Sequence, residues 1–308
     1  MSLKQLGFIP LPPHTRPGGF DHVAIHQGTG RLYVAHTIND AVDVIDCPQD
    51  RYLHSIPGLT GVAGALVSDE RNLIFTSNRG ENTVGIFAPD DEAGLVRVAV
   101  GVRPNGLAYD PARNLLLAAN VGDPAQPGSF TVSVVDVAQR ALMASIPVPG
   151  RTRWPIYDAG AQVFYVNIME PAQIVVIAAA DPTRVAVTIP IPIAGPHGLD
   201  LDSERGRLFC ACDGKELVVL DTRTRAITDT LALSGVPDVV FFNAGLQRLY
   251  VAIGDPGVID VFDTVAMRRV EIVSTEKGAH TIGFDPARNK VYAFLPQSCG
   301  AAVYSDNG

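Results

Sequence analysis

The stretch RPNGLAYDPARNLLLAAN, residues 103–120, decides the fold, because variants of it recur along the whole chain. Each copy has one variable residue near the start of a short apolar segment, and an apolar or aromatic residue follows 12 positions later. The seven variable positions are Asp21, Ala63, Asn105, Arg153, His197, Asp238 and His280. The steps between them are 42, 42, 48, 44, 41 and 42 residues. Repeats of this length that consist of short strands are typical of a β-propeller with one blade per repeat.

Each repeat has the same order of short strands separated by turns. In the first repeat the strands are DHVAIH, RLYVAH, AVDVID and RYLHSIPG, with Gly, Asn and Asp between them. The seventh repeat ends after three strands, and the N-terminal segment QLGFIPL has the composition of the missing fourth. We therefore predict an all-β, seven-bladed propeller that forms one domain, residues 1–308. In this prediction residues 4–11 supply the fourth strand of the last blade. Closure of the ring hides the edges that an open sheet would expose.

The composition indicates a large apolar core and few charges. The chain is 47% hydrophobic and 18% charged, with a formal net charge of −8. We expect no nucleic-acid partner, because a phosphate backbone needs clustered Lys and Arg and the sequence has no basic run. No apolar stretch suits a signal peptide or a membrane span. We expect a cytoplasmic monomer, or a periplasmic one if a leader was removed.

The four cysteines are expected to be buried free thiols that act as small apolar side chains. Cys210 and Cys212 lie two residues apart on a strand and therefore point to the same face. They lack the CxxC spacing of a zinc knuckle, and Cys47 and Cys299 belong to different repeats. Packing is therefore favoured over a metal or redox role for all four.

The phrases RPNGLAYDPARNLLLAAN and GPHGLDLDSERGRLFCAC resemble the YVTN-type repeat of seven-bladed β-propellers. That repeat reads roughly Gly-Pro-x-Gly, an apolar strand, Pro-Asp-Gly and Tyr-Val-Thr-Asn, and its last part becomes YVAH, FTSN, LAAN and FYVN here. Later repeats end in Cys212, Ile253 and Leu295, where Asn is expected. The resemblance covers essentially the whole chain. It implies the fold but no activity, because propellers carry many unrelated functions.

The variable positions should form a ring at one mouth of the central channel, because the first strand of each blade lines that channel. Blades five, six, seven and one are neighbours in the closed ring and offer imidazole and carboxylate groups. Such groups suit a divalent ion, which would lower the pKa of a bound water. We predict that one divalent ion of unspecified identity is held by His197, His280, Asp238, Asp21 and His22.

The remaining arc of the ring suits the binding of a substrate. Arg153 with Asn105 could hold a carboxylate or carbonyl oxygen against the aromatic face of Trp154. His36 flanks the ring at the end of a second strand, and Arg16 lies in the connection that leads into the first blade. The predicted substrate-binding residues are Asn105, Arg153, Trp154, His36 and Arg16, and the predicted catalytic residues are Asp21, Asp238 and Arg153.

These residues also have structural interpretations. A polar residue at the start of a strand often satisfies backbone groups of the turn, which applies to Asp21 and Asp238. Nothing in the repeat requires imidazole at His197 or His280. Arg153 at a channel mouth is costly unless it is paired.

Two functions follow from the sequence as alternatives. The first is a metal-assisted hydrolase of the lactonase or esterase class, in which Asp21 or Asp238 is the general base and Arg153 or Asn105 polarises the carbonyl. The architecture is distantly similar to the gluconolactonase and senescence-marker-protein family, which implies Glu, Asn and Asp around a divalent ion, but this ring has no Glu. A lyase with a histidine base, as in propellers of the virginiamycin-lyase type, belongs to the same branch. The second function is a non-catalytic platform that binds a peptide or small ligand.

Overall fold

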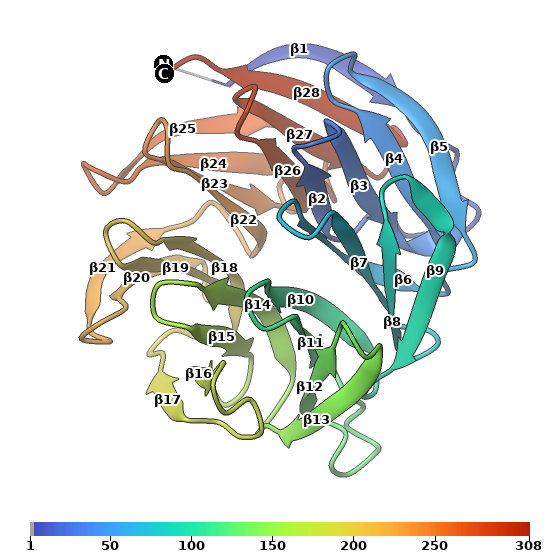
Figure 1. Cartoon of the computed structure of the whole chain (residues 1–308). Coiled ribbons are helices and arrows are strands. Elements are labelled where there is room, and N and C mark those ends of the chain that lie inside the picture. The colour runs from blue at the N-terminus through green and yellow to red at the C-terminus, as the bar shows by residue number, and fades with distance from the viewer. Residues whose placement is uncertain (1–2) are drawn as a thin grey trace.

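The structure, a computed structural model that describes residues 3–308, is a closed ring of seven four-stranded antiparallel sheets around a central channel (Figure 1). In blades one to six the strands follow chain order from the channel to the rim. The predicted fold class is therefore confirmed. In this part of the chain, no helix is long and apolar enough to cross a membrane.

The strand bounds show the repeat directly. The first three blades consist of β2 (Val23–His26), β3 (Arg31–His36), β4 (Ala41–Asp46) and β5 (Arg51–Pro57); β6 (Val62–Ser68), β7 (Leu73–Asn78), β8 (Thr83–Ala88) and β9 (Asp91–Ala99); β10 (Pro104–Asp110), β11 (Leu115–Asn120), β12 (Thr131–Asp136) and β13 (Ala141–Pro147). The next three consist of β14 (Thr152–Asp158), β15 (Val163–Ile168), β16 (Gln173–Ala178) and β17 (Val187–Pro190); β18 (Pro196–Asp202), β19 (Arg207–Cys212), β20 (Glu216–Asp221) and β21 (Ile227–Ala232); β22 (Pro237–Asn243), β23 (Arg248–Ile253), β24 (Val258–Asp263) and β25 (Arg268–Ser274). A single 3₁₀ turn, η1 (Thr37–Asn39), joins β3 to β4.

The seventh blade combines the two ends of the chain. Its strands β26 (Thr281–Asp285), β27 (Lys290–Leu295) and β28 (Gly300–Asp306) are completed at the rim by β1 (Leu3–Pro10). β1 pairs antiparallel with β28 from Leu3 opposite Asp306 to Pro10 opposite Gly300. The prediction that residues 4–11 close the ring is therefore confirmed.

The apolar core is divided among the interfaces between blades. Seven buried clusters form, and each combines residues from two neighbouring blades, with the last cluster joining blade seven to blade one. The apolar residues that follow the variable positions by 12 residues lie in these clusters, and all seven are buried. They are Tyr33, Phe75, Leu117, Tyr165, Phe209, Tyr250 and Tyr292. The repeated apolar partner is therefore what packs one blade against the next.

The variable positions coincide with irregularities at the start of the channel strands. In blades two to six the pairing register shifts at this point, as between Pro196 and Gly198 around His197, and between Pro237 and Val240 around Asp238. The same shift occurs around Ala63, Asn105 and Arg153. A β-bulge redirects the side chain at which it occurs. In each of these five blades the variable residue therefore lies outside the regular strand pairing.

Neighbouring blades approach closely just after the bulges. A Cβ on Gly198 would lie 2.2 Å from the carbonyl oxygen of Asp238, and one on Gly64 would lie 2.3 Å from that of Asn105. Polar side chains of the preceding blade bind the same kind of carbonyl, since the Asn167 amide donates to His197 O at 2.9 Å. The backbone at the ring positions is therefore fixed by the adjacent blade.

Candidate functional site

The channel mouth where the channel strands begin carries a chain of contacting polar side chains. The Arg153 guanidinium lies 3.5 Å from Asp213 Oδ2, and Asp213 Oδ1 lies 2.7 Å from His197 Nδ1. The other ring nitrogen of His197, Nε2, lies 3.3 Å from Asp238 Oδ1. Blades four, five and six are thereby linked through one imidazole whose two nitrogens both face carboxylates.

The chain continues to His280 and ends on the backbone. Asp238 Oδ2 lies 3.4 Å from His280 Nδ1, and His280 Nε2 lies 3.1 Å from the carbonyl oxygen of Phe20. The structure therefore brings together three of the five predicted metal ligands, His197, Asp238 and His280, through one central carboxylate.

The charges in this chain shift the pKa values of its members. Burial lowers the pKa of His197, but the carboxylates of Asp238 and Asp213 outweigh burial and raise that pKa to about 9. Burial likewise opposes the ionisation of Asp238, yet the charge of His197 and its hydrogen bond to Asp238 hold the pKa of this carboxyl well below the usual value, with smaller effects from His280 and His22 when these are protonated. At neutral pH the centre of the site is an imidazolium between two carboxylates.

The other two predicted metal ligands, Asp21 and His22, lie beside this chain and have different neighbours. Asp21 Oδ2 lies 3.2 Å from the Arg79 guanidinium, and Asp21 Oδ1 lies 3.5 Å from His22 Nε2. The His22 ring stacks on Trp154, with ring centroids 4.1 Å apart. Burial lowers the pKa of His22, although the charges of Asp21 and Asp238 oppose this effect. His22 is therefore a neutral imidazole at physiological pH.

Arginine side chains gather on the arc that was predicted to bind substrate. The pKa of Arg151 is lowered by burial and by the positive charges of Arg153, Arg79 and Arg103. Within residues 3–308, the buried Nε atoms of Arg79 and Arg153 and the Oδ1 of Asn105 have no hydrogen-bond partner. An arginine is an expensive group to bury without its hydrogen bonds. This arc is therefore suited to an anionic group with several acceptor oxygens.

The two remaining predicted substrate residues lie outside the ring. His36 is fully buried and contacts His14 and Asp43, at 2.7 and 2.8 Å. The Arg16 side chain pairs with Asp40 at 2.9 Å. His36 lies beside the seam between the first and last blades, through His14 and Pro296, whereas Arg16 contacts Thr37 and Asp40 of blade one.

The channel behind the mouth is a separate, mostly apolar cavity of about 730 Å³. His22 and Trp154 line its near end, and it extends to residues at the far ends of the channel strands, such as Asn243. Asp200 lies on its wall and accepts hydrogen bonds from the amides of Leu201 and Phe242. Burial raises the pKa of Asp200 to about 7, against the effect of these amides.

Sequence reasoning missed Arg79 and Asp213, which pair with Asp21 and with Arg153 and His197. Both directly follow the last residue of a second strand, Asn78 and Cys212. In the seven repeats only these two carry a charge at that position; the others are Thr37, Val121, Met169, Gly254 and Pro296. This exception was a usable signal.

The ring residues suit a divalent ion in donor type, but their present arrangement is one of hydrogen bonds and ion pairs. Both nitrogens of His197 and of His280 face oxygen atoms. Among the described residues, the group of His, Cys, Asp or Glu donors whose atoms all lie within 4.8 Å of one another is found elsewhere, at His14, His36 and Cys299. An ion on the ring would have to replace the proton that His197 holds.

The comparison with solved structures supports the fold, and no comparison gives a family. No protein-family model matches the chain, and no curated protein is similar to it in sequence. Among solved structures, a chain of Kuenenia stuttgartiensis hydrazine synthase superimposes with a TM-score of 0.83 and 13% sequence identity, over 96% of this chain and 97% of that one. At this identity the likeness shows the shared seven-bladed propeller fold and nothing more.

Proposed function

We propose that the ring mouth binds a small anionic molecule and hydrolyses an ester or lactone bond in it, assisted by one divalent ion. One observation carries this proposal: a group of incompletely bonded arginines lies next to a histidine–carboxylate chain on the same mouth. Arginines bind carboxylate or phosphate oxygens, and histidine–carboxylate pairs transfer protons. Binding and proton transfer would thus take place on adjacent blades.

In this proposal Arg153 and Asn105 bind the anionic group and polarise the carbonyl, while Trp154 packs against the substrate. Asp21 or Asp238 accepts a proton from the attacking water and passes it to the leaving oxygen.

The proposed divalent ion would be held by Asp238, His197 and His280, with Asp21 and His22 beside them. When bound, it would lower the pKa of a water molecule and stabilise negative charge on the carbonyl oxygen. Both effects serve the hydrolysis of an ester or lactone.

The test is a hydrolysis screen with paired substrates, each ester or lactone offered with and without a carboxylate group. Arg153→Ala should reduce kcat/KM on the carboxylated member about 100-fold or more, equivalent to roughly 3 kcal/mol, and should affect the uncharged member less. His54→Gln is the control, because His54 lies on the rim strand β5 and pairs with Glu92. Equal loss on both members would contradict the anion-binding role.

Metal content tests the ion separately. Elemental analysis of untagged protein should find one divalent ion that the His197→Ala/His280→Ala double variant loses, beyond any ion bound elsewhere. Metal content identical in both proteins would remove the ion from the proposal.

A non-catalytic platform is the second candidate, and two contacts favour it. His280 Nε2 faces a backbone carbonyl, and His197 is already engaged by two carboxylates. If calorimetry detects carboxylate binding that requires Arg153, while no ester or lactone is turned over, the platform is the better account.

A further inference from the structure

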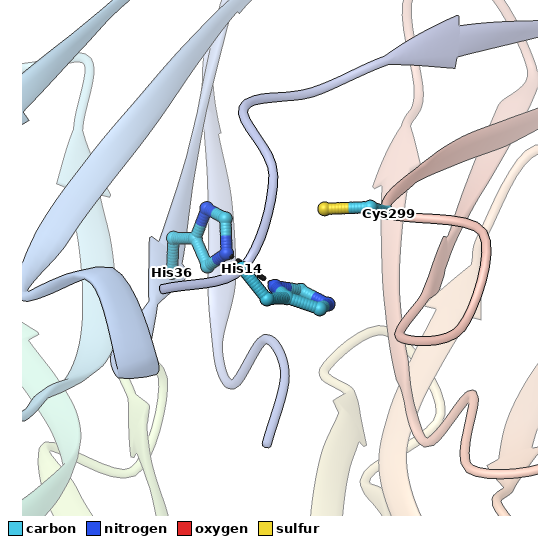
Figure 2. Close-up of side chains that lie close together, drawn as sticks. All are labelled: His14, His36 and Cys299. Carbon is cyan, nitrogen blue, oxygen red and sulfur yellow. Dashed lines mark hydrogen bonds between the residues drawn. The ribbon is translucent and has the colours of Figure 1, made fainter. Parts of the chain in front are cut away.

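Three side chains from distant parts of the sequence meet beside the seam between the first and last blades (Figure 2). His14 lies in the connection between β1 and β2, His36 ends β3, and Cys299 lies in the turn between β27 and β28. Their potential ligand atoms all lie within 4.8 Å of one another. In Figure 2 the Cys299 sulfur points toward the side on which the two imidazoles lie.

The position of the ring proton on His36 is fixed by a buried carboxylate. His36 Nδ1 lies 2.8 Å from Asp43 Oδ2, and both residues are fully buried. The second oxygen of Asp43 accepts a hydrogen bond from Ser55 Oγ. Although the Asn39 amide nitrogen lies 3.3 Å from the same Nδ1, the shorter contact to an acceptor-only group requires a proton there. The lone pair of neutral His36 is therefore on Nε2.

His14 is fixed in the opposite sense. Its Nε2 lies 2.7 Å from the carbonyl oxygen of Pro296, which can only accept, so Nε2 carries the proton and Nδ1 the lone pair. His14 Nδ1 and His36 Nε2 are 2.7 Å apart. Two lone pairs of neutral imidazoles thus face each other at hydrogen-bond distance. Such a contact needs a cation between the two nitrogens, either an extra proton or a metal ion.

The third group, Cys299, occupies a turn position that is unusual for cysteine. It directly precedes the third strand of its blade and has a φ of 53°, in the left-handed region. In the four other blades whose residue at this position has a positive φ, that residue is Asp40, Asn82, Lys215 or Gly257. Asn, Asp and Gly tolerate this conformation best. The thiol is half-buried and lies 3.0 Å from the carbonyl oxygen of Pro12.

We propose that His14 Nδ1, His36 Nε2 and Cys299 Sγ bind one zinc ion, with a fourth position open to solvent. Two imidazoles and one thiolate suit zinc, and a carboxylate behind a ligating histidine is a common orienting partner. Zinc–nitrogen bonds of about 2.0–2.1 Å in a tetrahedron place the two nitrogens about 3.3 Å apart, so half-buried His14 has to move slightly. As zinc binds, the thiol proton and the proton shared by the two imidazoles both pass to solvent.

The site would fasten the closure of the ring, because its ligands come from both sides of the seam. Next to it the strand pairing of β1 and β28 ends at Pro10 and Gly300. A ligand that binds only the folded protein stabilises it by mass action. Zinc should therefore raise the melting temperature of this propeller without entering the ring mouth.

Cobalt(II) substitution tests the site with a spectroscopic readout. Apart from any ion at the ring mouth, the metal-free full chain should bind one equivalent of Co²⁺ through a thiolate. This ion should give tetrahedral visible bands and a thiolate-to-cobalt band in the near ultraviolet, and Zn²⁺ should displace both. Cys299→Asn should abolish the thiolate band and weaken zinc binding at least tenfold. Its fold should survive, because Asn82 occupies the same turn position in blade two. His36 is left intact, since its removal would leave the buried carboxylate of Asp43 unpaired.

Two controls separate this site from the ring mouth. His54→Gln and the His197→Ala/His280→Ala double variant should keep the thiolate band and the zinc-induced rise in melting temperature. The proposal is overturned if the wild type takes up no Co²⁺ or Zn²⁺ at micromolar concentration, which would leave a shared proton between the histidines. It is also overturned if Cys299→Asn binds cobalt with an unchanged spectrum.

Discussion

At the residue scale, the variable position of each repeat can differ between blades because its side chain does not pack in the interface between blades. The register shift around Asp238 or Arg153 turns the side chain toward the mouth, while the apolar residue 12 positions later fills the interface between blades. Ala63 at the same position shows that the scaffold requires no polar group there. The polar residues at the other six positions are therefore not explained by the packing of the scaffold.

Asp200 gives a prediction about pH. Its carboxyl has a pKa of about 7 in the folded protein, against 3.8 as its ordinary value, so the folded state retains a proton that the unfolded state releases. Stability should fall as the pH rises between these two values, because the charged form is disfavoured on the channel wall.

Asp200→Asn should remove that part of the pH dependence. Relative to wild type, the variant should gain roughly 2 kcal/mol in the free energy of unfolding between pH 5 and pH 8. Urea unfolding at several pH values measures this. Loss of the hydrogen bond from the Phe242 amide would change the free energy of unfolding by the same amount at every pH. The slope of this free energy against pH therefore reports the titration of Asp200 alone. Parallel curves for the two proteins would contradict the expected titration.

At the element scale, the site depends on how closely neighbouring channel strands approach. Gly198 in β18 faces the carbonyl of Asp238 in β22, so the backbone of one ring residue rests against the preceding blade. A side chain at this point must displace the bulge that carries Asp238.

Gly198→Ala should therefore affect both stability and the site. We expect a loss of about 1–3 kcal/mol in unfolding free energy, as for other overpacked interiors, together with weaker ligand binding at the ring mouth. Gly245→Ala is the matched control, because a Cβ there meets no atom closer than 3.5 Å. Similar melting temperatures for the two variants would show that the interface is more compliant than the structure indicates.

The sequence predicted the strands well and the side-chain contacts only in part. A period near 42 residues and the strand patterns were sufficient for seven blades and for closure by the N-terminal strand. The chain His197–Asp238–His280 followed from adjacency in the ring. The charges of Arg79 and Asp213 stand out in the repeat, but their partners could not be predicted, because the pairings depend on how side chains of different blades meet at the mouth.

The meeting of His14, His36 and Cys299 was also beyond the sequence. These residues lie on three connections whose relative positions exist only after the ring has closed. Cys299 was interpreted as packing because its partners are far away in the chain and in no recognised spacing.

At the scale of the whole molecule, stability depends on one antiparallel pairing between the two ends of the chain. β1 covers β28, which would otherwise present an unpaired edge at the rim of blade seven. Ile9 and Leu11 also belong to the apolar cluster between blades seven and one.

Deletion of residues 1–11 should open this seam and strongly lower the melting temperature, with broader unfolding and a tendency to aggregate. Removal of Asn307 and Gly308, which follow β28, is the control and should change little. Differential scanning calorimetry and light scattering measure both effects. A truncated protein that melts within a few degrees of the full chain would show that β1 is dispensable.

The pairing of β1 with β28 also sets an order of events during protein synthesis. β1 emerges from the ribosome long before its partner, and six complete blades can be assembled while it still has no strand beside it. Domains generally fold as they are made, with the N-terminal parts first. Here β1 is translated before all other strands of the ring and is among the last to be incorporated. The nascent chain must therefore keep an extended, partly apolar segment from pairing with anything else until the final hairpin arrives.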